Sequence, residues 1–250
     1  MKRVMFFLMF ASLLAYAGCE KPDNPDVTPD TSDTIDDPDT PPSDEWLFSV
    51  SDSTMVRFAP GNLEYDEIDG YYFVAHQYDY GGYFGYGTGN NPTFTSTDYR
   101  DYPDFDDWGN HIDGGWRTLS ADEWCYVLWD RDSASAKYGV ATVCGVHGMV
   151  LLPDSWHGGA FTPGFDNGWS TNVYDTSLWS DMEDAGAVFL PAAANRVGSA
   201  VGNVGTFGDY WSSSPNGWGA RSIVFEDGYV YHSEDGGRFY GLSVRLVQDY

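Results

Sequence analysis

The sequence of the C-terminal part of this chain predicts short strands separated by turns. An apolar run at 220–225 and a second strand-like run at 229–232 are joined through Asp227-Gly228. A two-residue turn of this type places both central residues at positive φ, and therefore predicts a β-hairpin. The chain closes on 241–247, where an alternating Ser-Val-Arg-Leu-Val must pair inside a sheet, because an unpaired terminal strand would fray.

The same segment is rich in side chains that suit recognition of a partner. Aromatic residues and Arg supply large contact areas at low entropic cost, and they dominate the binding free energy of many interfaces. Tyr229 and Tyr231 share one face of a predicted strand, so an inward-facing core position stays open for them. The candidate ligand-binding residues are Trp218, Arg221, Tyr229, Tyr231, His232, Arg238, Phe239 and Tyr240.

Residues 1–18 resemble a secretory signal that ends at a cysteine. A basic start precedes an apolar run at 4–17, which is too short to span a bilayer comfortably. Ala17-Gly18-Cys19 resembles a bacterial lipoprotein cleavage site. The resemblance implies acylation of Cys19, and two or more acyl chains would anchor the protein stably in a membrane. An ordinary signal peptide with an incidental Cys is the alternative.

Residues 19–45 predict a disordered tether. Within them, residues 20–45 contain ten Asp or Glu, six Pro and one Lys, with almost no aliphatic side chains. Such a segment buries too little apolar surface to offset the entropy of ordering, and Pro and like charges keep it extended. A charge run without a role would have the same composition. The early acidic residues resemble an export tag of some Gram-negative groups, which implies an outer-membrane protein that faces the cell exterior.

The remaining residues, 46–250, are expected to form one acidic domain. Of the 12 Lys and Arg and the 38 Asp and Glu of the chain, three and ten precede Trp46, which leaves nine basic and 28 acidic residues. The resulting net charge of −19 repels polyanions, so we exclude a nucleic-acid partner. About 205 residues are ample for one substantial core.

The strand and helix signals of this domain predict the α+β class. Further strand-like runs lie at 48–50, 55–58, 63–65, 71–74, 140–143, 149–152 and 187–190. Residues 145–148 are expected to form the turn between 140–143 and 149–152. Ser120 with Glu123 forms a capping box that begins a helix ending near Asp132, and a second helix is expected over 177–184. The aperiodic, aromatic-rich stretch 78–115 predicts a long structured loop.

Six motifs in order along the chain resemble the Fibrobacter succinogenes major paralogous domain family. They are VRFAPGNL at 56–63, WRTLS at 116–120 with Glu123-Trp124, LLPD at 151–154, AGAVFLPAA at 185–193, YWSSS at 210–214 and GLSVRLV at 241–247. The family consists of bacterial surface proteins, often lipoproteins. The resemblance implies a C-type-lectin-like domain with two helices, a small mixed or antiparallel sheet and long structured loops. Its C-terminal strands would carry a variable ligand face, and relatives diversified by retroelements imply that 215–240 is the diversifiable segment.

No arrangement of catalytic residues is evident in the sequence. The five His residues are scattered, which favours single surface or core histidines over a metal triad. The related formylglycine-generating enzymes use a Cys pair near their C-terminal end, whereas no Cys follows Cys144 here. For Cys125 and Cys144 we favour two separate thiols over a disulfide. We therefore expect no cofactor, no metal and no enzymatic activity.

Acidic clusters leave two alternatives open. Asp98, Asp101, Asp104, Asp106 and Asp107 form a cluster that favours a solvated loop, although closely spaced carboxylates also suit Ca²⁺. The pairs Glu226-Asp227 and Glu234-Asp235 flank the C-terminal hairpin, where they would bind Ca²⁺ or attract a basic partner.

The remaining polar motifs predict structural roles. Arg117 and Arg245 are interpreted as members of structural ion pairs. Trp211 is expected to be buried on a core strand, and the serines that follow it lack the Gly-x-Ser-x-Gly frame of a nucleophile elbow.

Taken together, the sequence predicts a lipid-anchored surface protein that binds a protein or glycan ligand through its C-terminal face. An enzyme on the related formylglycine-generating fold and a structural adhesin subunit are the alternatives.

Overall fold

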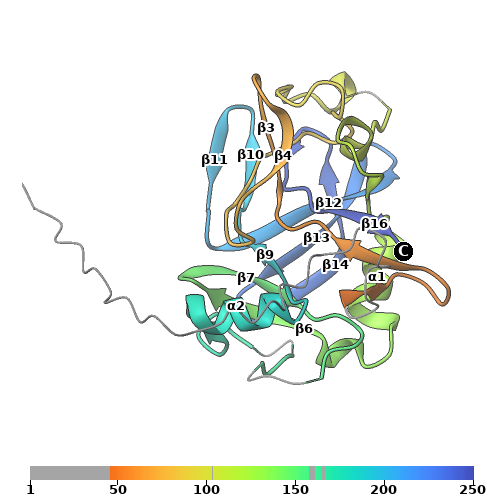
Figure 1. Ribbon diagram of the computed structural model, residues 1–250. Helices are drawn as coiled ribbons and strands as arrows, with labels where there is room; N and C mark the ends of the chain where they lie inside the picture. Colours follow the sequence, from red (N-terminus) through yellow and green to blue (C-terminus); the bar gives the residue numbers. More distant parts are fainter. Residues whose placement is uncertain (1–45, 103, 158–160, 165–166) are drawn as a thin grey trace, which may run out of the picture. The chain divides into compact units, whose positions relative to one another are not determined.

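The last strand of the chain lies in the middle of a four-stranded antiparallel sheet that also contains the first two strands. The computed structural model describes residues 46–102, 104–157, 161–164 and 167–250 (Figure 1). The strand order is β1 (Phe48–Ser49), β2 (Met55–Phe58), β16 (Leu246–Asp249) and β5 (Trp116–Thr118). The expected pairing of the terminal strand is therefore confirmed, and it ties the two ends of the described chain together.

A second four-stranded sheet is built around one tight hairpin. Its order is β8 (Val173–Tyr174), β6 (Tyr138–Val143), β7 (Val146–Leu151) and β9 (Val188–Pro191), and β8 runs parallel to β6. The predicted turn at 145–148 is wrong, because Val143 pairs directly with Val146. Cys144 and Gly145 form the turn instead, with φ of 51° and 82°, which matches the backbone twist of a two-residue hairpin.

The predicted C-terminal hairpin belongs to a third, three-stranded antiparallel sheet. It contains β12 (Phe207–Asn216), β13 (Gly219–Glu226) and β14 (Tyr229–Gly237) in that order. Glu226 pairs with Tyr229, so Asp227-Gly228 is the turn, as expected. Only Gly228 has positive φ (81°), however, and the expectation of positive φ at Asp227 is wrong.

The remaining strands lie in two small sheets, and a long irregular segment follows β4. β3 (Leu63–Asp66) pairs with β4 (Gly70–Phe73), and β10 (Asn195–Val197) lies between β11 (Ala200–Gly202) and β15 (Tyr240–Gly241). The described part of 78–115 contains no named strand, but two short 3₁₀ turns, η2 (Tyr99–Asp101) and η3 (Trp108–His111). This segment is ordered by bonds such as Phe84 N to Leu242 O, 2.9 Å. The predicted structured loop is confirmed.

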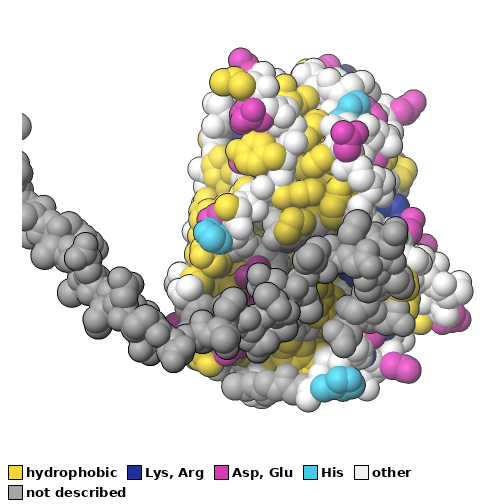
Figure 2. Space-filling model, in the orientation of Figure 1, with side chains coloured by type: hydrophobic (Ala, Val, Ile, Leu, Met, Phe, Trp, Pro, Cys, Tyr) yellow, Lys and Arg dark blue, Asp and Glu magenta, His cyan; other side chains and the backbone are white. Residues whose placement is uncertain are grey.

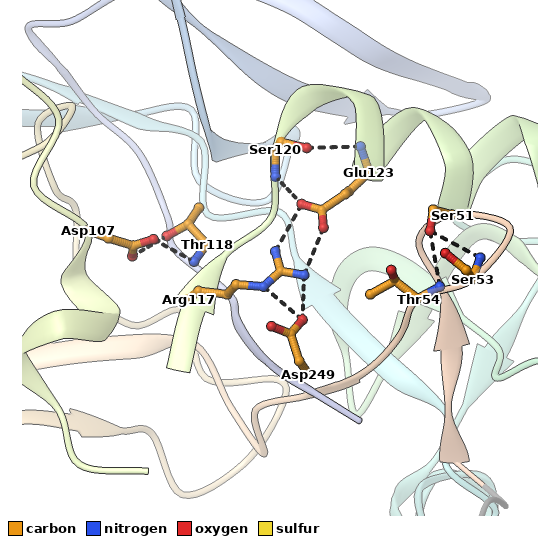
Figure 3. Close-up of polar contacts among 9 residues, drawn as sticks. All are labelled: Ser51, Ser53, Thr54, Asp107, Arg117, Thr118, Ser120, Glu123 and Asp249. Carbon is orange, nitrogen blue, oxygen red and sulfur yellow. Dashed lines mark hydrogen bonds and ion pairs between the residues drawn. The ribbon is translucent and has the colours of Figure 1, made fainter. Parts of the chain in front are cut away.

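The first helix begins at the predicted capping box. Ser120 accepts a hydrogen bond from Glu123 N, and Glu123 Oε2 accepts one from Ser120 N, before α1 (Ala121–Cys125) and the π-helical turn η4 (Tyr126–Asp130). Arg117 on β5 donates to both Glu123 and Asp249, which joins β5, α1 and β16 (Figure 3). The predicted ion-pair role of Arg117 is therefore confirmed.

The second helix, α2 (Thr176–Asp184), covers the sheet that contains β6, β7 and β9. Asp175 caps its first turn by accepting from Ser177 N and Leu178 N, and Gly186 follows its end at a φ of 89°. Trp179 and Met182 face inward and pack with Phe189 on β9. The helix begins one residue before its predicted start at Ser177.

The core contains a fully buried arginine that has no carboxylate at ion-pair distance among the described residues. Arg245 Nη1 donates to Ala59 O (2.9 Å), and Nη2 donates to Phe189 O. The predicted ion pair of Arg245 is wrong, because backbone carbonyls take the place of an acid. Burial lowers the pKa of Arg245 to about 10.

The described residues form mostly short strands, two short helices and several sheets, which is a mixed α/β structure consistent with the predicted α+β class. Trp211 is buried, as expected, and donates from Nε1 to Phe84 O (2.7 Å). No helix in the described residues has the length and apolar character needed to cross a membrane. The predicted signal (1–18), the lipidated Cys19 and the tether (19–45) lie outside the described residues.

Candidate functional site

The eight predicted ligand-binding residues are spread along the β13–β14 hairpin and the chain that follows it to Tyr240 on β15. Trp218 lies in the turn before β13, close to the pair Gly219–Gly237, whereas Tyr229 follows the other turn, where it pairs with Glu226. At about 3.3 Å per residue, the seven steps from Gly219 to Glu226 separate these ends by about 23 Å. The predicted set therefore does not form one continuous site.

At the first end, an exposed tryptophan stacks on a tyrosine from the long loop. Gly217 (φ 51°) and Trp218 form the turn between β12 and β13, and Trp218 is 74% exposed. Its ring lies 5.5 Å from the ring of Tyr99, with 24° between the planes. A large aromatic side chain this exposed, and held by a second ring, presents a flat surface to solvent.

Two adjoining hollows flank this aromatic pair, and together we call them the Trp218 cleft. They share Tyr99, Gly217 and Trp218 as lining residues, and their volumes are about 290 and 490 Å³. The smaller is also lined by Arg100, Tyr102 and Arg238, and the larger by Asn216, Gly219, Asp235, Gly236, Gly237 and Phe239.

Four glycines line the cleft, and at two of them, Gly219 and Gly237, there is no room for a side chain. A Cβ at Gly219 would collide with Gly236 O, and one at Gly237 would lie 2.5 Å from the Phe239 ring. Glycines at such positions let a ligand approach the main chain closely.

Two arginines give the cleft its positive charge. Arg238 donates from Nε to Gly219 O (3.2 Å), and its guanidinium lies 5.3 Å from the centre of the Tyr86 ring. Arg100 donates to both carboxylate oxygens of Asp98, which lowers the pKa of Asp98 to about 2. Asp235 adds an exposed carboxylate to the cleft. The cleft therefore offers donors, acceptors and ring faces together.

At the other end, two tyrosines point to solvent. Tyr229 and Tyr231 are 58% and 41% exposed, and their rings stack at 6.3 Å with 15° between planes. The alternative of an inward-facing core position is thus excluded for both. His232 is half-buried and lies edge-on to Trp129 of η4, 5.3 Å between ring centroids. It points toward the helix, away from the two tyrosines, because neighbouring side chains of a strand alternate.

The other three predicted residues are half-buried and take part in packing. Arg221 Nη1 donates to Ser233 Oγ within the hairpin. Phe239 packs on Tyr240 with ring centroids 4.5 Å apart, and Tyr240 also packs against a core cluster. Of these, Phe239 lines the cleft and Tyr240 is chiefly structural.

The sequence interpretation missed the contribution of Tyr99, Arg100 and Tyr102 to the cleft. All three come from the long segment 78–115, whose aromatic content was the one available signal. No periodic pattern fixes the path of such a loop, so its contact with a hairpin more than 100 residues away could not be inferred.

Several clustered acids prove to have structural roles. Asp107 accepts from Gly109 N, Thr118 N and Thr118 Oγ1, and Asp106 Oδ2 lies 2.8 Å from His111 Nε2. The described residues contain no group of three or more His, Cys, Asp or Glu that could hold a metal ion. Cys125 and Cys144 are both free, as favoured from the sequence.

Acidic side chains are spread over the face of the molecule shown in Figure 2, where basic ones are scarcely visible. This agrees with the net charge of −19 carried by 46–250. Comparison with family models, with curated proteins and with solved structures found no match.

Proposed function

We propose that this chain is a lipid-anchored surface protein of the outer membrane, and that it binds a protein or glycan ligand in the Trp218 cleft. The exposed Trp218, held against Tyr99 beside Arg100 and Arg238, is the observation that carries this proposal. Burying an aromatic ring of this size, together with charge-assisted hydrogen bonds from Arg, would supply the main part of the binding free energy.

We further propose that the domain has a C-type-lectin-like fold, as the resemblance to the Fibrobacter succinogenes major paralogous domain family implies. Three features support this assignment: the paired first and last strands, the two helices, and the long loop that helps to line the cleft. The C-terminal strands supply the rest of the cleft, in agreement with a ligand face in the segment 215–240.

The anchor at Cys19 and the tether at 19–45 would hold the domain away from the membrane, facing the cell exterior. This arrangement gives the cleft access to ligands on other cells or in the medium. Trp218 at the rim of the cleft can vary without disturbing the core because it lies in a turn.

The experiment is a screen of the full chain against glycan and protein arrays, with Trp218→Ala and Arg238→Ala as test variants and Tyr72→Ala as the control. Tyr72 is 39% exposed on β4 and does not line the cleft. We expect about a tenfold or greater loss of binding for the cleft variants and no loss for the control. Binding that survives both cleft substitutions would place the ligand elsewhere, and turnover of a bound compound would favour the enzyme alternative.

A further inference from the structure

The opposite end of the hairpin presents a second surface that the Trp218 cleft does not include. Register across β12, β13 and β14 places nine side chains in three rows on one face of the sheet. The rows are Phe207, Glu226 and Tyr229; then Asp209, Val224 and Tyr231; then Trp211, Ser222 and Glu234. Directly opposed residues point to the same face, so these rows define one surface. We call its Tyr229, Tyr231, Glu226, Glu234 and Asp209 the tyrosine face.

Exposure to solvent decreases across the tyrosine face, from the residues on β14 to Asp209 on β12. Tyr229, Tyr231 and Glu234 on β14 are exposed, as is Glu226 on β13. Asp209 on β12 is 9% exposed, and its Oδ1 has no hydrogen-bond partner. A buried carboxylate oxygen without a donor is costly, so a cation bound close to Asp209 would stabilise its charged form.

Glu234 lies close enough for its charge to act on the Asp209 carboxyl. No arginine or lysine forms an ion pair with Asp209, Glu226 or Glu234 in the described part of the chain. The two exposed carboxylates, Glu226 and Glu234, therefore lie beside the stacked tyrosine rings without a compensating cation of their own.

We propose that the tyrosine face binds a basic side chain, Arg or Lys, from a segment of a partner protein. A cation over the faces of Tyr229 and Tyr231 gains a cation–π interaction, and Glu226 and Glu234 add ion pairs on either side. The net charge of −19 steers a basic segment toward the domain before contact.

A partner side chain fits this surface better than a metal ion does. Two of the groups at its centre are aromatic rings, which do not ligate Ca²⁺, and hard cations need six or more oxygen ligands. The described residues provide no cluster of three metal-binding side chains here or elsewhere. The surface differs from the Trp218 cleft: its Tyr229 end lies about 23 Å from the cleft along the hairpin, and Glu234 at its other end neighbours Asp235, which lines the cleft.

The test is calorimetric titration of the full chain with a capped tetra-arginine peptide at low and at physiological ionic strength. We expect Tyr231→Ala and Glu234→Gln each to weaken binding about tenfold, whereas Tyr231→Phe, which keeps the ring, retains it. Tyr72→Ala and Glu67→Gln, which remove an exposed ring and an exposed acid on or beside the β3–β4 hairpin, should bind the peptide like the unmodified chain.

Circular dichroism of each variant establishes that it is folded, and Glu234→Gln keeps the test valid if Tyr231→Ala unfolds. Equal binding by all variants would overturn the proposal, because it would assign the affinity to diffuse charge. Absence of peptide binding at low ionic strength would overturn it as well. Ca²⁺ that competes with the peptide, and that binds Tyr231→Ala unchanged, would identify a metal site in place of a partner surface.

Discussion

At the scale of single residues, the buried arginines of this domain all donate to backbone carbonyls, and only Arg131 also forms an ion pair. Arg131 combines both, donating to Val127 O (2.7 Å) and to Asp154 Oδ1 (2.9 Å), whereas Arg245 relies on Ala59 O and Phe189 O. A carbonyl partner cannot be identified from a sequence pattern, since every residue has a backbone carbonyl. This is why the partners of Arg245, which lies directly before β16, could not be predicted from the sequence.

Asp209 predicts a specific dependence of stability on pH. Burial raises the pKa of Asp209 to about 7, and the charge of Glu234 adds to that effect. The unfolded carboxyl titrates near 3.8, so the folded state binds more protons between about pH 4 and 7. The free energy of unfolding should therefore fall as pH rises through this range, by up to a few kcal/mol.

Urea denaturation of the unmodified chain and of Asp209→Asn at pH 5 and pH 8 measures this. We expect Asp209→Asn to gain stability relative to the unmodified chain at pH 8 and to lose that advantage at pH 5. Asp113→Asn, at an exposed position, is the matched control. Asp154 makes an opposing contribution: burial raises the pKa of its carboxyl, but the hydrogen bond from Ser49 and the charge of Arg131 lower it overall. That contribution to stability is lost only below about pH 4, outside the range tested. An equal pH dependence in Asp209→Asn and Asp113→Asn would refute the assignment to Asp209.

At the scale of elements, the capping box makes α1 a junction between the terminal sheet and the hairpin. Glu123 accepts from Ser120 N and also from Arg117, which in turn binds Asp249 on the last strand (Figure 3). The helix itself is only five residues long before the π turn, too short to be stable alone. Its position therefore depends on these polar bonds and on the buried Trp124.

Ser120→Ala should lower the free energy of unfolding by about 1 kcal/mol, since it leaves Glu123 N without its capping acceptor. Glu123→Ala should cost more, because it removes both the reciprocal cap and the partner of Arg117. The measurement is the urea midpoint of each variant, with Ser53→Ala in the exposed β1–β2 turn as the control. A loss for Ser53→Ala as large as that for Ser120→Ala would contradict a capping role.

Elements governed by local chemistry were predictable, and their assembly was not. The capping box, the Asp227-Gly228 turn and the strand at the C-terminus all depend on residues a few positions apart. The Trp218 cleft depends on a loop and a hairpin that meet across more than 100 residues of sequence. The length of β13 and β14, longer than their apolar runs, then separates the tyrosines from the tryptophan.

At the scale of the whole molecule, the excess of acidic residues opposes folding. The 46–250 segment carries 28 Asp and Glu against nine Lys and Arg, and of those nine, Arg131, Arg196 and Arg245 are buried. Like charges at the surface repel in the compact state more than in the expanded one. The same charge would keep copies of the protein apart on a crowded membrane and draw in basic partners.

Screening this repulsion should stabilise the protein. Raising the NaCl concentration from low to above physiological ionic strength is expected to raise Tm by about 2–4 °C, the shift that about 1 kcal/mol produces in a domain of this size. CaCl₂ at matched ionic strength separates screening from specific binding. Equal shifts in both salts indicate screening alone, whereas a larger shift in CaCl₂ would indicate a bound ion. A Tm that falls with NaCl would mean that attractive pairs such as Arg117 with Asp249 outweigh the net repulsion.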